Sequence, residues 1–337
     1  TIIKEFKEIV FYIISVKPQT ISIEHITIRV SEDTRFYGHG INSINEMYNS
    51  LINDTIISDC FIGIFVSGSD NLISNNTLID CDYGIYLASN SKVFDNLFIN
   101  SDLSIFAEEP KIINNKFYDS GININRYDDI DIFFDNNLIN DKPFKFLHKE
   151  SDKTITDQAG QIIVLNCENI NIKYQDMKTS YSSIYLIESE DCIISECEFN
   201  ISKRAVSIFN CQDIFINNNE FDIFHNDFSS AQAISVIDSN SIEIMDNSII
   251  CTNNDFSQGS GISSENSTLV VIMHNILSNL IEGVTLISKN NVIEQNTFQN
   301  NDIGILYLRL NLKLIGFFGP FGEHLIQENN FIKNGQS

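Results

Sequence analysis

Short apolar phrases recur along this chain at a nearly fixed interval. A small residue followed by apolar residues starts at 63, 84 and 104 ("GIFV", "GIYL", "SIFA"), and again at 261, 283 and 304 ("GISS", "GVTL", "GILY"). Related phrases fill the middle of the chain: "GINI" at 121, "GQII" at 160, "SIYL" at 183, "SIFN" at 207 and "AISV" at 233. An interval of about 20 residues indicates a repeat protein.

Asparagine-rich turns run in step with these phrases. Examples are "NNTLI" at 75, "DNLFI" at 95, "NNKFY" at 114, "NNEF" at 218, "DNSII" at 246 and "QNTF" at 295. Each repeat therefore predicts two or three short strands, too short for a strand-helix-strand unit. The pattern predicts an all-β chain whose repeats are coils of a parallel β-helix stacked roughly 4.8 Å apart. Asn suits the corners because it tolerates a left-handed backbone and because stacked amides can hydrogen-bond between coils.

The same pattern predicts one long domain with a cap. We expect a cap over residues 1–20 and a β-helix over 21–337, with an excursion near 122–159 and a glycine-rich loop at 309–324. Apolar residues of the cap fall at helical spacing and predict an amphipathic segment: Ile2, Phe6, Ile9 or Val10, and Ile13.

Charge narrows the choice of partners. The chain has 45 acidic and 21 basic residues, a formal net charge of −24, which repels phosphate backbones and anionic lipid surfaces. The longest early apolar run, residues 9–16, is too short to span a bilayer. We therefore expect no nucleic-acid partner and no membrane span, while the oligomeric state stays open.

One tripeptide, Gly38-His39-Gly40, also occurs in the active site of polygalacturonases. That family places Asn-Thr-Asp and Asp-Asp motifs before the tripeptide and an Arg-Ile-Lys motif after it. Here the single Asp-Asp, Asp128 with Asp129, comes later, and Arg-Ile-Lys does not occur. Because Gly40 stands 23 residues before "GIFV", the repeat favours a structural position for His39, and no catalytic residue is assigned.

A more specific pattern lies in residues 142–200, where a Pro-aromatic strand and a polar stretch lead into Ala-Gly-Gln, an apolar strand and an Asn-Cys turn. The matching residues are Ala159, Gly160, Gln161, Asn166 and Cys167. The segment resembles the NosD-like right-handed parallel β-helix proteins, and the repeats from 40 to 308 fit that family more loosely. The resemblance implies a secreted or surface-attached protein of archaea or bacteria, in a wider group that binds or cleaves carbohydrate.

Cysteines and metal ligands give weaker signals. The chain has seven cysteines, an odd number, so one thiol at least stays unpaired within the chain. Cys60 and Cys81 are one coil apart, a spacing that a disulfide accepts, whereas Cys167 and Cys211 predict a small buried residue at one corner. No Cys-x-x-Cys or paired His spacing occurs, and His and Met are scattered, so the copper-maturation role of the founding NosD protein finds no support. We predict no metal site and no cofactor.

Two segments are candidates for function. In residues 125–135, Asp129 and Asp131 would share one strand face close to Arg126, as in the calcium-plus-base site of a polysaccharide lyase; the alternative is a solvated outer face. The second segment carries the densest positive charge of the chain beside two aromatic residues. Its predicted ligand-binding residues are Lys142, Phe144, Lys145, Phe146, His148 and Lys149, followed by Lys153.

Aromatic faces with nearby cations suit an acidic glycan or an acidic neighbouring surface protein, although a solvated Lys-rich hairpin explains the same residues. We therefore predict an extracellular structural or carbohydrate-binding surface protein without catalysis. The alternative is a polysaccharide lyase or glycosidase on the same scaffold, and a metallochaperone-like accessory ranks third.

Overall fold

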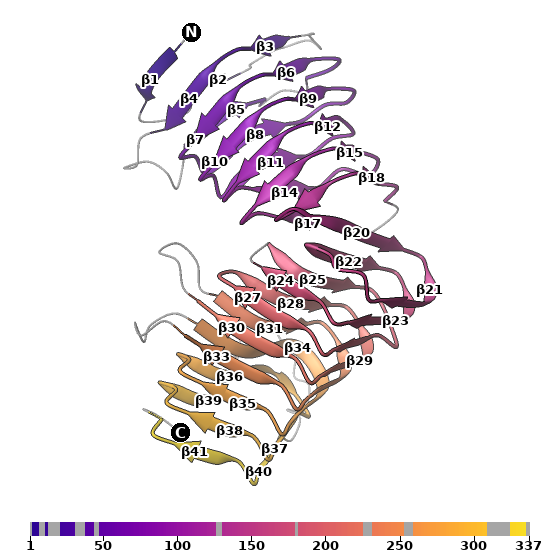
Figure 1. Ribbon diagram of the computed structural model, residues 1–337, viewed down its shortest axis with the longest axis vertical. Helices are drawn as coiled ribbons and strands as arrows, with labels where there is room; N and C mark the ends of the chain where they lie inside the picture. The colour runs from indigo at the N-terminus through magenta and orange to yellow at the C-terminus, as the bar shows by residue number, and fades with distance from the viewer. Residues whose placement is uncertain are drawn as a thin grey trace, which may run out of the picture. The chain divides into compact units, whose positions relative to one another are not determined.

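The structure is a computed structural model of the 337-residue chain. It describes residues 2–6, 11–12, 21–30, 38–43, 47–125, 130–178, 181–224, 231–252, 259–308 and 324–334. Two compact units, Thr1–Phe144 (unit 1) and Lys145–Ser337 (unit 2), make up the chain. Every described element is a β-strand (Figure 1). In each unit the strands pair in parallel along three faces of successive coils, which confirms the right-handed parallel β-helix.

Each coil of unit 1 contributes one strand to each face. Face 1 consists of β2 (Phe11–Tyr12), β5 (His39–Asn42), β8 (Ile62–Val66), β11 (Tyr83–Leu87), β14 (Asp102–Ile105) and β17 (Ile122–Ile124). Face 2 consists of β3 (Ser22–Glu24), β6 (Leu51–Asn53), β9 (Leu72–Ser74), β12 (Lys92–Phe94), β15 (Lys111–Ile113) and β18 (Phe133–Asp135). Face 3 consists of β1 (Ile2–Phe6), β4 (Thr27–Val30), β7 (Ile56–Ser58), β10 (Thr77–Ile79), β13 (Leu97–Ile99), β16 (Lys116–Tyr118) and β19 (Leu138–Ile139).

Unit 2 repeats this plan. Face 1 consists of β22 (Gln161–Leu165), β25 (Ser182–Ile187), β28 (Arg204–Phe209), β31 (Ala231–Ile237), the first part of β34 (Gly259–Met273), β36 (Glu282–Lys289) and β39 (Ile303–Tyr307). Face 2 consists of β21 (Ser151–Ile155), β23 (Glu168–Lys173), β26 (Ile193–Ser195), β29 (Gln212–Asn217), β32 (Asn240–Met245), the second part of β34, β37 (Val292–Glu294) and β40 (Leu325–Gln327). Face 3 consists of β24 (Asp176–Lys178), β27 (Glu198–Ile201), β30 (Glu220–Ile223), β33 (Ser248–Cys251), β35 (Ile276–Ser278), β38 (Thr297–Gln299) and β41 (Asn330–Ile332).

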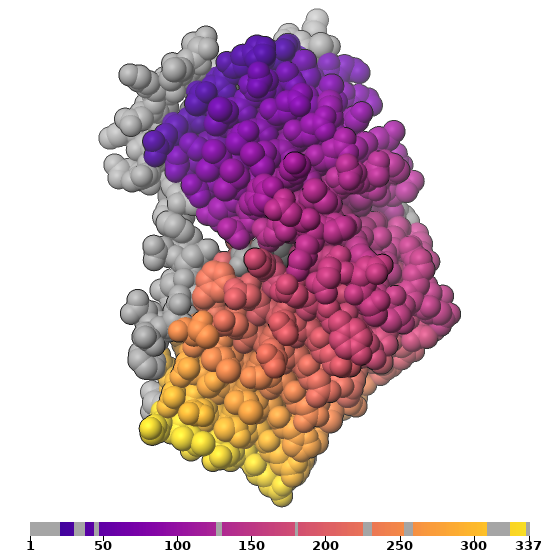
Figure 2. Space-filling model, viewed as in Figure 1, coloured from indigo at the N-terminus to yellow at the C-terminus, as the bar shows by residue number. Residues whose placement is uncertain are grey.

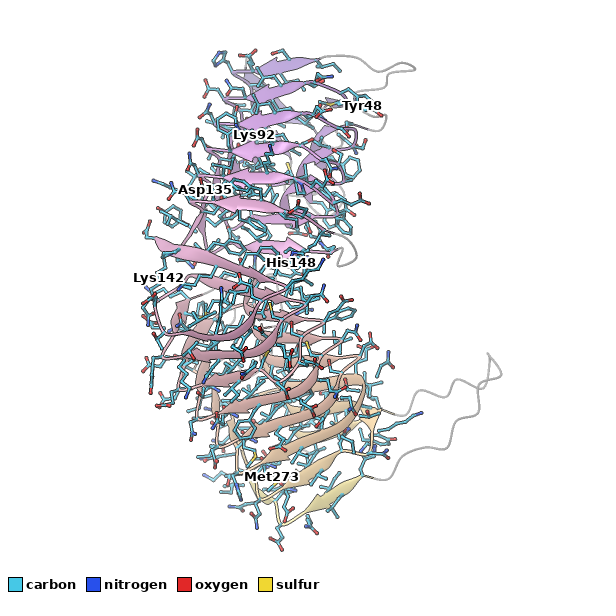
Figure 3. All side chains as sticks on the ribbon, turned by 90° about the vertical axis from the view of Figure 1, so that its right-hand side faces the viewer. Tyr48, Lys92, Asp135, Lys142, His148 and Met273 are labelled. Carbon is cyan, nitrogen blue, oxygen red and sulfur yellow. The ribbon has the colours of Figure 1, made fainter. Side chains whose placement is uncertain are left out.

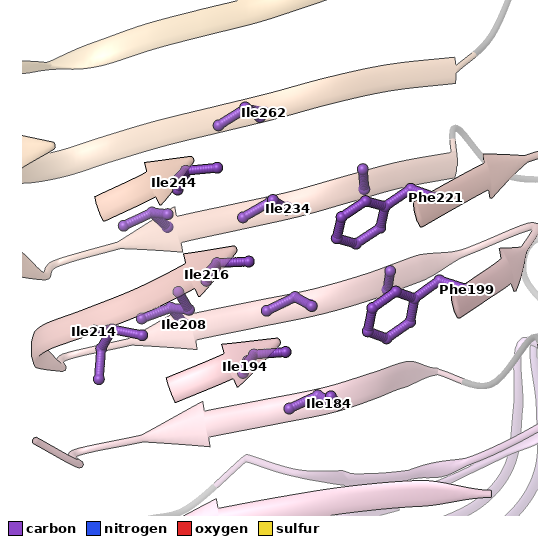
Figure 4. Packing of buried hydrophobic residues seen from close by; sticks show 14 of the residues in the cluster. Ile184, Ile194, Phe199, Ile208, Ile214, Ile216, Phe221, Ile234, Ile244 and Ile262 are labelled. Carbon is purple, nitrogen blue, oxygen red and sulfur yellow. The ribbon is translucent and has the colours of Figure 1, made fainter. Parts of the chain in front are cut away.

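Columns of identical side chains fill the interior of each unit. In unit 2, Ile194, Ile216 and Ile244 lie in register on neighbouring strands, and each is fully buried (Figure 4). The rings of Phe199 and Phe221 stack with centroids 4.7 Å apart. Such columns arise because strand side chains alternate between inside and outside, so that each repeat places the same residue type on top of the last.

The predicted asparagine corners are confirmed. At one corner of unit 1, a residue with positive φ precedes a buried Asn in four successive coils: Asn75-Asn76, Asp95-Asn96, Asn114-Asn115 and Asn136-Asn137. The backbone N–H of each buried Asn donates to the side-chain oxygen of the next, over 2.9–3.0 Å. This amide ladder satisfies polar groups that no water reaches and thereby fixes the spacing of the coils.

All seven cysteines are free and buried, as expected for small corner residues. Cys60 and Cys81 do not form a disulfide. Cys167 and Cys211 occupy one corner of unit 2, where their backbone N–H groups donate to the hydroxyls of Ser189 and Ser239, 3.1 and 3.0 Å away. The repeated corner is thus filled by small residues, which in chain order are Cys167, Ser189, Cys211, Ser239 and Ser267.

We expect the thiols to resist labelling in the native protein. Burial raises the pKa of Cys192 and Cys197 to about 11 and that of Cys211 to about 12. These thiols therefore stay protonated at pH 8, and only the deprotonated thiolate reacts with a labelling reagent. Thiol titration at pH 8 should detect seven thiols in denaturant and slow reaction of all seven without it. Fast labelling of Cys211 in the folded protein would contradict the corner assignment.

Three details of the sequence-based layout are wrong. The described parts of the expected cap, residues 2–6 and 11–12, are not helical: β1 and β2 pair in parallel with β4 and β5 and continue the β-helix. The positions of Ile9, Val10 and Ile13 lie outside the described residues.

The expected excursion near 122–159 belongs mostly to the coils. It contains β17, β18 and β19 of unit 1, and its polar part contains β21, which pairs in parallel with β23. β21 is polar because four of its five side chains are exposed on the first strand of its face. The loop expected at 309–324 lies outside the described residues, except for His324.

The alignment of three repeat phrases is also wrong. "GQII" begins one residue early, because its third residue, Ile162, pairs with Ile184, the second residue of "SIYL". Tyr86 of "GIYL" pairs with Ser104, the first residue of "SIFA", so this phrase begins two residues late. "SIFN" is displaced in the same way, because Tyr185 pairs with Ser207. A shift of two residues keeps every side chain on its original face, so the hydrophobic pattern cannot detect it.

Candidate functional site

Aromatic side chains gather on the outside of face 1 in unit 1. Phe65 and Tyr86 lie in register on β8 and β11, at the outward position between buried residues. We call the group the aromatic column; its members are all partly exposed, and they are His39, Phe61, Phe65, Tyr83, Tyr86 and Phe106. The strands of face 1 belong to successive coils, so this column crosses them. In the space-filling view the colours of each unit follow one another in chain order (Figure 2).

Three rings of the column stack on one another. The centroids of Phe65 and Tyr86 are 5.2 Å apart, and those of Tyr86 and Phe106 are 4.4 Å apart. The strand partner of Tyr86 is the small Ser104, and the ring of Phe106 packs against Tyr86 from just beyond the end of β14. Ser104 is consequently buried, with 1% of its surface exposed.

Tyr83 is placed differently. Its ring meets Phe61 and Tyr86 edge to face, at interplanar angles of 85° in both pairs, and no ring among the described residues stacks on it. Phe61 in turn contacts the imidazole of His39 with centroids 6.3 Å apart. Tyr83 and Phe61 are therefore the partly exposed Phe and Tyr rings of the column on which no other described ring stacks.

Polar side chains border the column on β14 and β17. The amide of Asn125 donates to the hydroxyl of Ser104 over 2.9 Å, and the amide of Asn123 donates to the carbonyl oxygen of the Asn125 side chain over 3.0 Å. Asn125 is partly exposed. Amides beside aromatic rings provide both the apolar contact and the directed hydrogen bonds that a sugar requires.

The column carries no charge at neutral pH. Burial lowers the pKa of His39, so its imidazole is neutral there, and its Nδ1 lies 3.2 Å from the amide of Asn42. Burial, and then the neighbouring Tyr83, raise the pKa of Tyr86, so its phenol keeps its proton. His39 is thus part of an uncharged aromatic surface and has no carboxylate partner among the contacts of the described residues.

The residues predicted to bind ligand lie on or next to β20 (Lys142–His148), whose first and last residues are labelled in Figure 3. The first three residues of this strand belong to unit 1 and the other four to unit 2. In unit 1, Pro143 pairs antiparallel with Leu138, and the ring of Phe144 packs on Phe134 with centroids 4.8 Å apart. Phe134 pairs with Ile112 of the preceding coil, and the side chain of Ile112 is buried in the interior of unit 1. Phe144 therefore covers the core of unit 1, which accounts for its presence without a ligand.

The unit 2 part of this segment is partly charge-neutralised. The Lys145 ammonium lies 3.9 Å from the Asp157 carboxylate, and Lys153 forms an ion pair with Glu150. Phe146 and His148 contact each other with ring centroids 5.9 Å apart and are both partly exposed, while Lys149 has a positive φ and is exposed. The sequence showed the lysines but not their carboxylate partners.

The candidate lyase segment is only partly visible. Arg126 and Asp129 lie outside the described residues. Asp131 is exposed and lies outside any strand, and its backbone N–H donates to the carbonyl of Glu108 over 2.8 Å. The expectation that Asp131 lies on a strand is therefore wrong, and the position of Asp129 stays a prediction.

The sequence contained a signal for the aromatic column that charge-based reasoning passed over. Phe65 and Tyr86 occupy the third place of consecutive repeat phrases, "GIFV" and "GIYL", so they had to fall on one outward row. Phe106 could not be placed in this way, because it lies just beyond the strand and contacts Tyr86 by leaning back toward the preceding coil.

Comparisons with known proteins agree with this architecture. A family model described as "Periplasmic copper-binding protein (NosD)" matches residues 19–130 and 144–337. No protein with a curated description matches the sequence.

Similar solved structures include the periplasmic alginate epimerase AlgG, with 13% identity and a TM-score of 0.42, covering 94% of this chain and 79% of that chain. The Streptococcus pneumoniae surface protein and adhesin PfbA has 13% identity and a TM-score of 0.41, covering 98% and 88%. The Azotobacter vinelandii mannuronan C-5 epimerase AlgE6 A-module has 10% identity and a TM-score of 0.31, covering 93% and 91%.

The copper named in the family description can be tested against the side chains. Within the described ranges, no three His, Cys, Asp or Glu side chains are arranged to hold a metal ion. The thiols of Cys192, Cys197 and Cys211 each donate to a backbone carbonyl 3.2–3.3 Å away and have raised pKa values, whereas a metal requires thiolates. The described residues therefore do not form a thiolate or imidazole copper site.

The described residues also contain no apolar helix of the length needed to cross a bilayer.

The family model covers most of the chain, and the coils, corners and three-faced strand pairing are those of a parallel β-helix. The chain therefore belongs to the NosD family of right-handed parallel β-helix proteins.

Proposed function

We propose that this protein binds carbohydrate through the aromatic column of unit 1, without catalysis, at the cell surface or in the periplasm. The observation that carries the proposal is Tyr83, a partly exposed ring on which no described ring stacks, with the partly exposed amide of Asn125 on the same face. Sugar rings have apolar faces that pack on aromatic side chains, and their hydroxyls pair with amides and phenols. The description of the matched family as periplasmic supports the location.

The carboxylates of face 1 favour binding over glycoside hydrolysis. In unit 1, the described strands of this face carry one carboxylate, Asp102, which is 4% exposed. A glycosidase of the usual kind needs two carboxyl groups about 5 to 9.5 Å apart. In unit 2, the strands of face 1 carry Glu265 and Glu282. Because Glu282 pairs with Ser260, five residues before Glu265, the two carboxylates are separated by roughly 17 Å along the strand.

We expect Tyr83→Ala to weaken glycan binding by about tenfold or more, because the substitution removes a partly exposed ring on which no described ring stacks. The phenylalanine variant, Tyr83→Phe, keeps the ring and should lose only the hydroxyl contribution. The measurement is a glycan array to find a ligand, followed by calorimetry with the parent and both variants.

Phe133→Ala is the matched control, since Phe133 is 51% exposed on face 2 of the same unit. It should leave binding unchanged. Equal loss in Phe133→Ala and Tyr83→Ala, or no loss in either, would place the glycan elsewhere. Unsaturated or shortened sugar products from the parent protein would favour the lyase or glycosidase alternative.

A further inference from the structure

We propose that the aromatic column selects uncharged glycan chains and rejects chains that carry carboxylates. The inference rests on the proposed function, because it names the class of sugar that the same surface takes. It departs from the acidic glycan predicted from the lysines around β20.

The face of the column offers no cation to an acidic ligand. The described strands of face 1 in unit 1, from β5 to β17, contain no Lys or Arg. Their one charged side chain is Asp102, whose carboxylate accepts a hydrogen bond from the backbone N–H of Gly121 over 2.8 Å. A ligand carboxylate placed on this face would lose hydration without gaining a partner of opposite charge.

The corner that leads into face 1 adds carboxylates. Asp59, Asp80 and Asp119 have positive φ values at this corner in different coils, before β8, β11 and after β16. Arg29 pairs with Asp59 over 3.0 Å, whereas Asp80 receives a neutral amide from Asn100 and Asp119 is exposed. Together with the net charge of −24, this arrangement repels an acidic chain.

Neutral hydroxyls fit the same surface. The phenols of Tyr83 and Tyr86 and the amides of Asn42 and Asn125 each act as both donor and acceptor. From His39 on β5 to Phe106 beyond β14, the column crosses three coil intervals, or roughly 14 Å. That length accommodates a short stretch of an extended oligosaccharide.

The experiment uses ligand pairs in which methyl esterification removes the negative charge: hexagalacturonate and hexamannuronate, each as the ionised carboxylate and as the methyl ester. Calorimetry near physiological salt should give the esters at least about tenfold higher affinity than the acids. Tyr83→Ala should weaken ester binding. Asn42→Lys, which places a cation in register with Phe65, should raise the affinity for the acids relative to the esters several-fold.

The outcomes separate this inference from the proposed function. If the esters bind more tightly than the acids and Asn42→Lys reduces this preference, the result supports both the proposed function and the selectivity. Acids bound as tightly as esters, with both weakened in Tyr83→Ala, would keep carbohydrate binding at the column and overturn the selectivity. No binding of any probe, or binding unaffected by Tyr83→Ala, would overturn both.

Discussion

Replacing Asn115 by Leu should lower the free energy of unfolding by about 4 kcal/mol, because it interrupts the amide ladder in the middle of unit 1. Asn115 is fully buried; its oxygen accepts from the backbone N–H and the amide of Asn96, both over 3.0 Å. Its amide donates to the carbonyl of Val93 over 3.0 Å and to the Asn137 side-chain oxygen over 3.0 Å. A leucine of similar size removes these four hydrogen bonds and leaves the backbone N–H of Asn96 buried without the acceptor it has in the parent. Urea unfolding followed by circular dichroism measures the loss.

The preceding residue is the control for this substitution. Asn114 is exposed and has a φ of 57°, a conformation that glycine adopts freely. Asn114→Gly should change the free energy of unfolding by no more than about 1 kcal/mol, since it loses only the exposed hydrogen bond from Asn136. Similar losses in the two variants would show that the buried ladder does not stabilise the coils.

Gly261→Ala should destabilise unit 2 by about 3 kcal/mol or more. A Cβ at Gly261 would lie 2.3 Å from the carbonyl oxygen of Gly283 in the next coil and 2.9 Å from a methyl carbon of Leu277. The carbonyl belongs to the backbone of a paired strand, β36, and cannot move without breaking the pairing between coils. Thermal unfolding of the purified variant measures the effect.

Gly259, on the same strand, provides the matched comparison. Its Cβ would meet only side-chain atoms, Cγ2 of Ile223 at 3.3 Å and Sγ of Cys251 at 3.5 Å. Gly259→Ala should therefore stay within about 1 kcal/mol of the parent. If Gly259→Ala unfolded as readily as Gly261→Ala, the close approach of neighbouring coils would not explain the glycine at 261.

The fold could be predicted from the sequence because each coil repeats the same local solution. The Asn pairs at 75–76 and 114–115 place one residue at positive φ and the next in the ladder, and both features follow from the chemistry of Asn alone. The register of "SIFA" could not be predicted in this way. Ser104 is as small as the residues that begin other phrases, such as Gly84, so the sequence allowed a phrase to begin there. Only the pairing of Leu103 with Ile85 shows that the phrase begins two residues earlier.

The candidate site was harder to predict because its members are defined by three-dimensional neighbours. Lys145 and Lys153 stood out in an acidic chain, but their pairing with Asp157 and Glu150 depends on how the strands fold. Phe144 resembled a ligand contact and instead packs on Phe134. Aromatic residues in a repeat are expected in the interior, so an outward aromatic row becomes visible only once inward and outward positions are known.

The most direct test of the binding surface is an NMR titration of protein carrying labelled Phe and Tyr rings with the neutral glycan that binds most tightly. We predict that the ring signals of Tyr83, Tyr86 and Phe106 shift on addition of the glycan, while those of Phe133 and Phe146 stay unchanged. A shift of the Phe146 signal with the column signals unmoved would contradict the account and return the binding surface to β20.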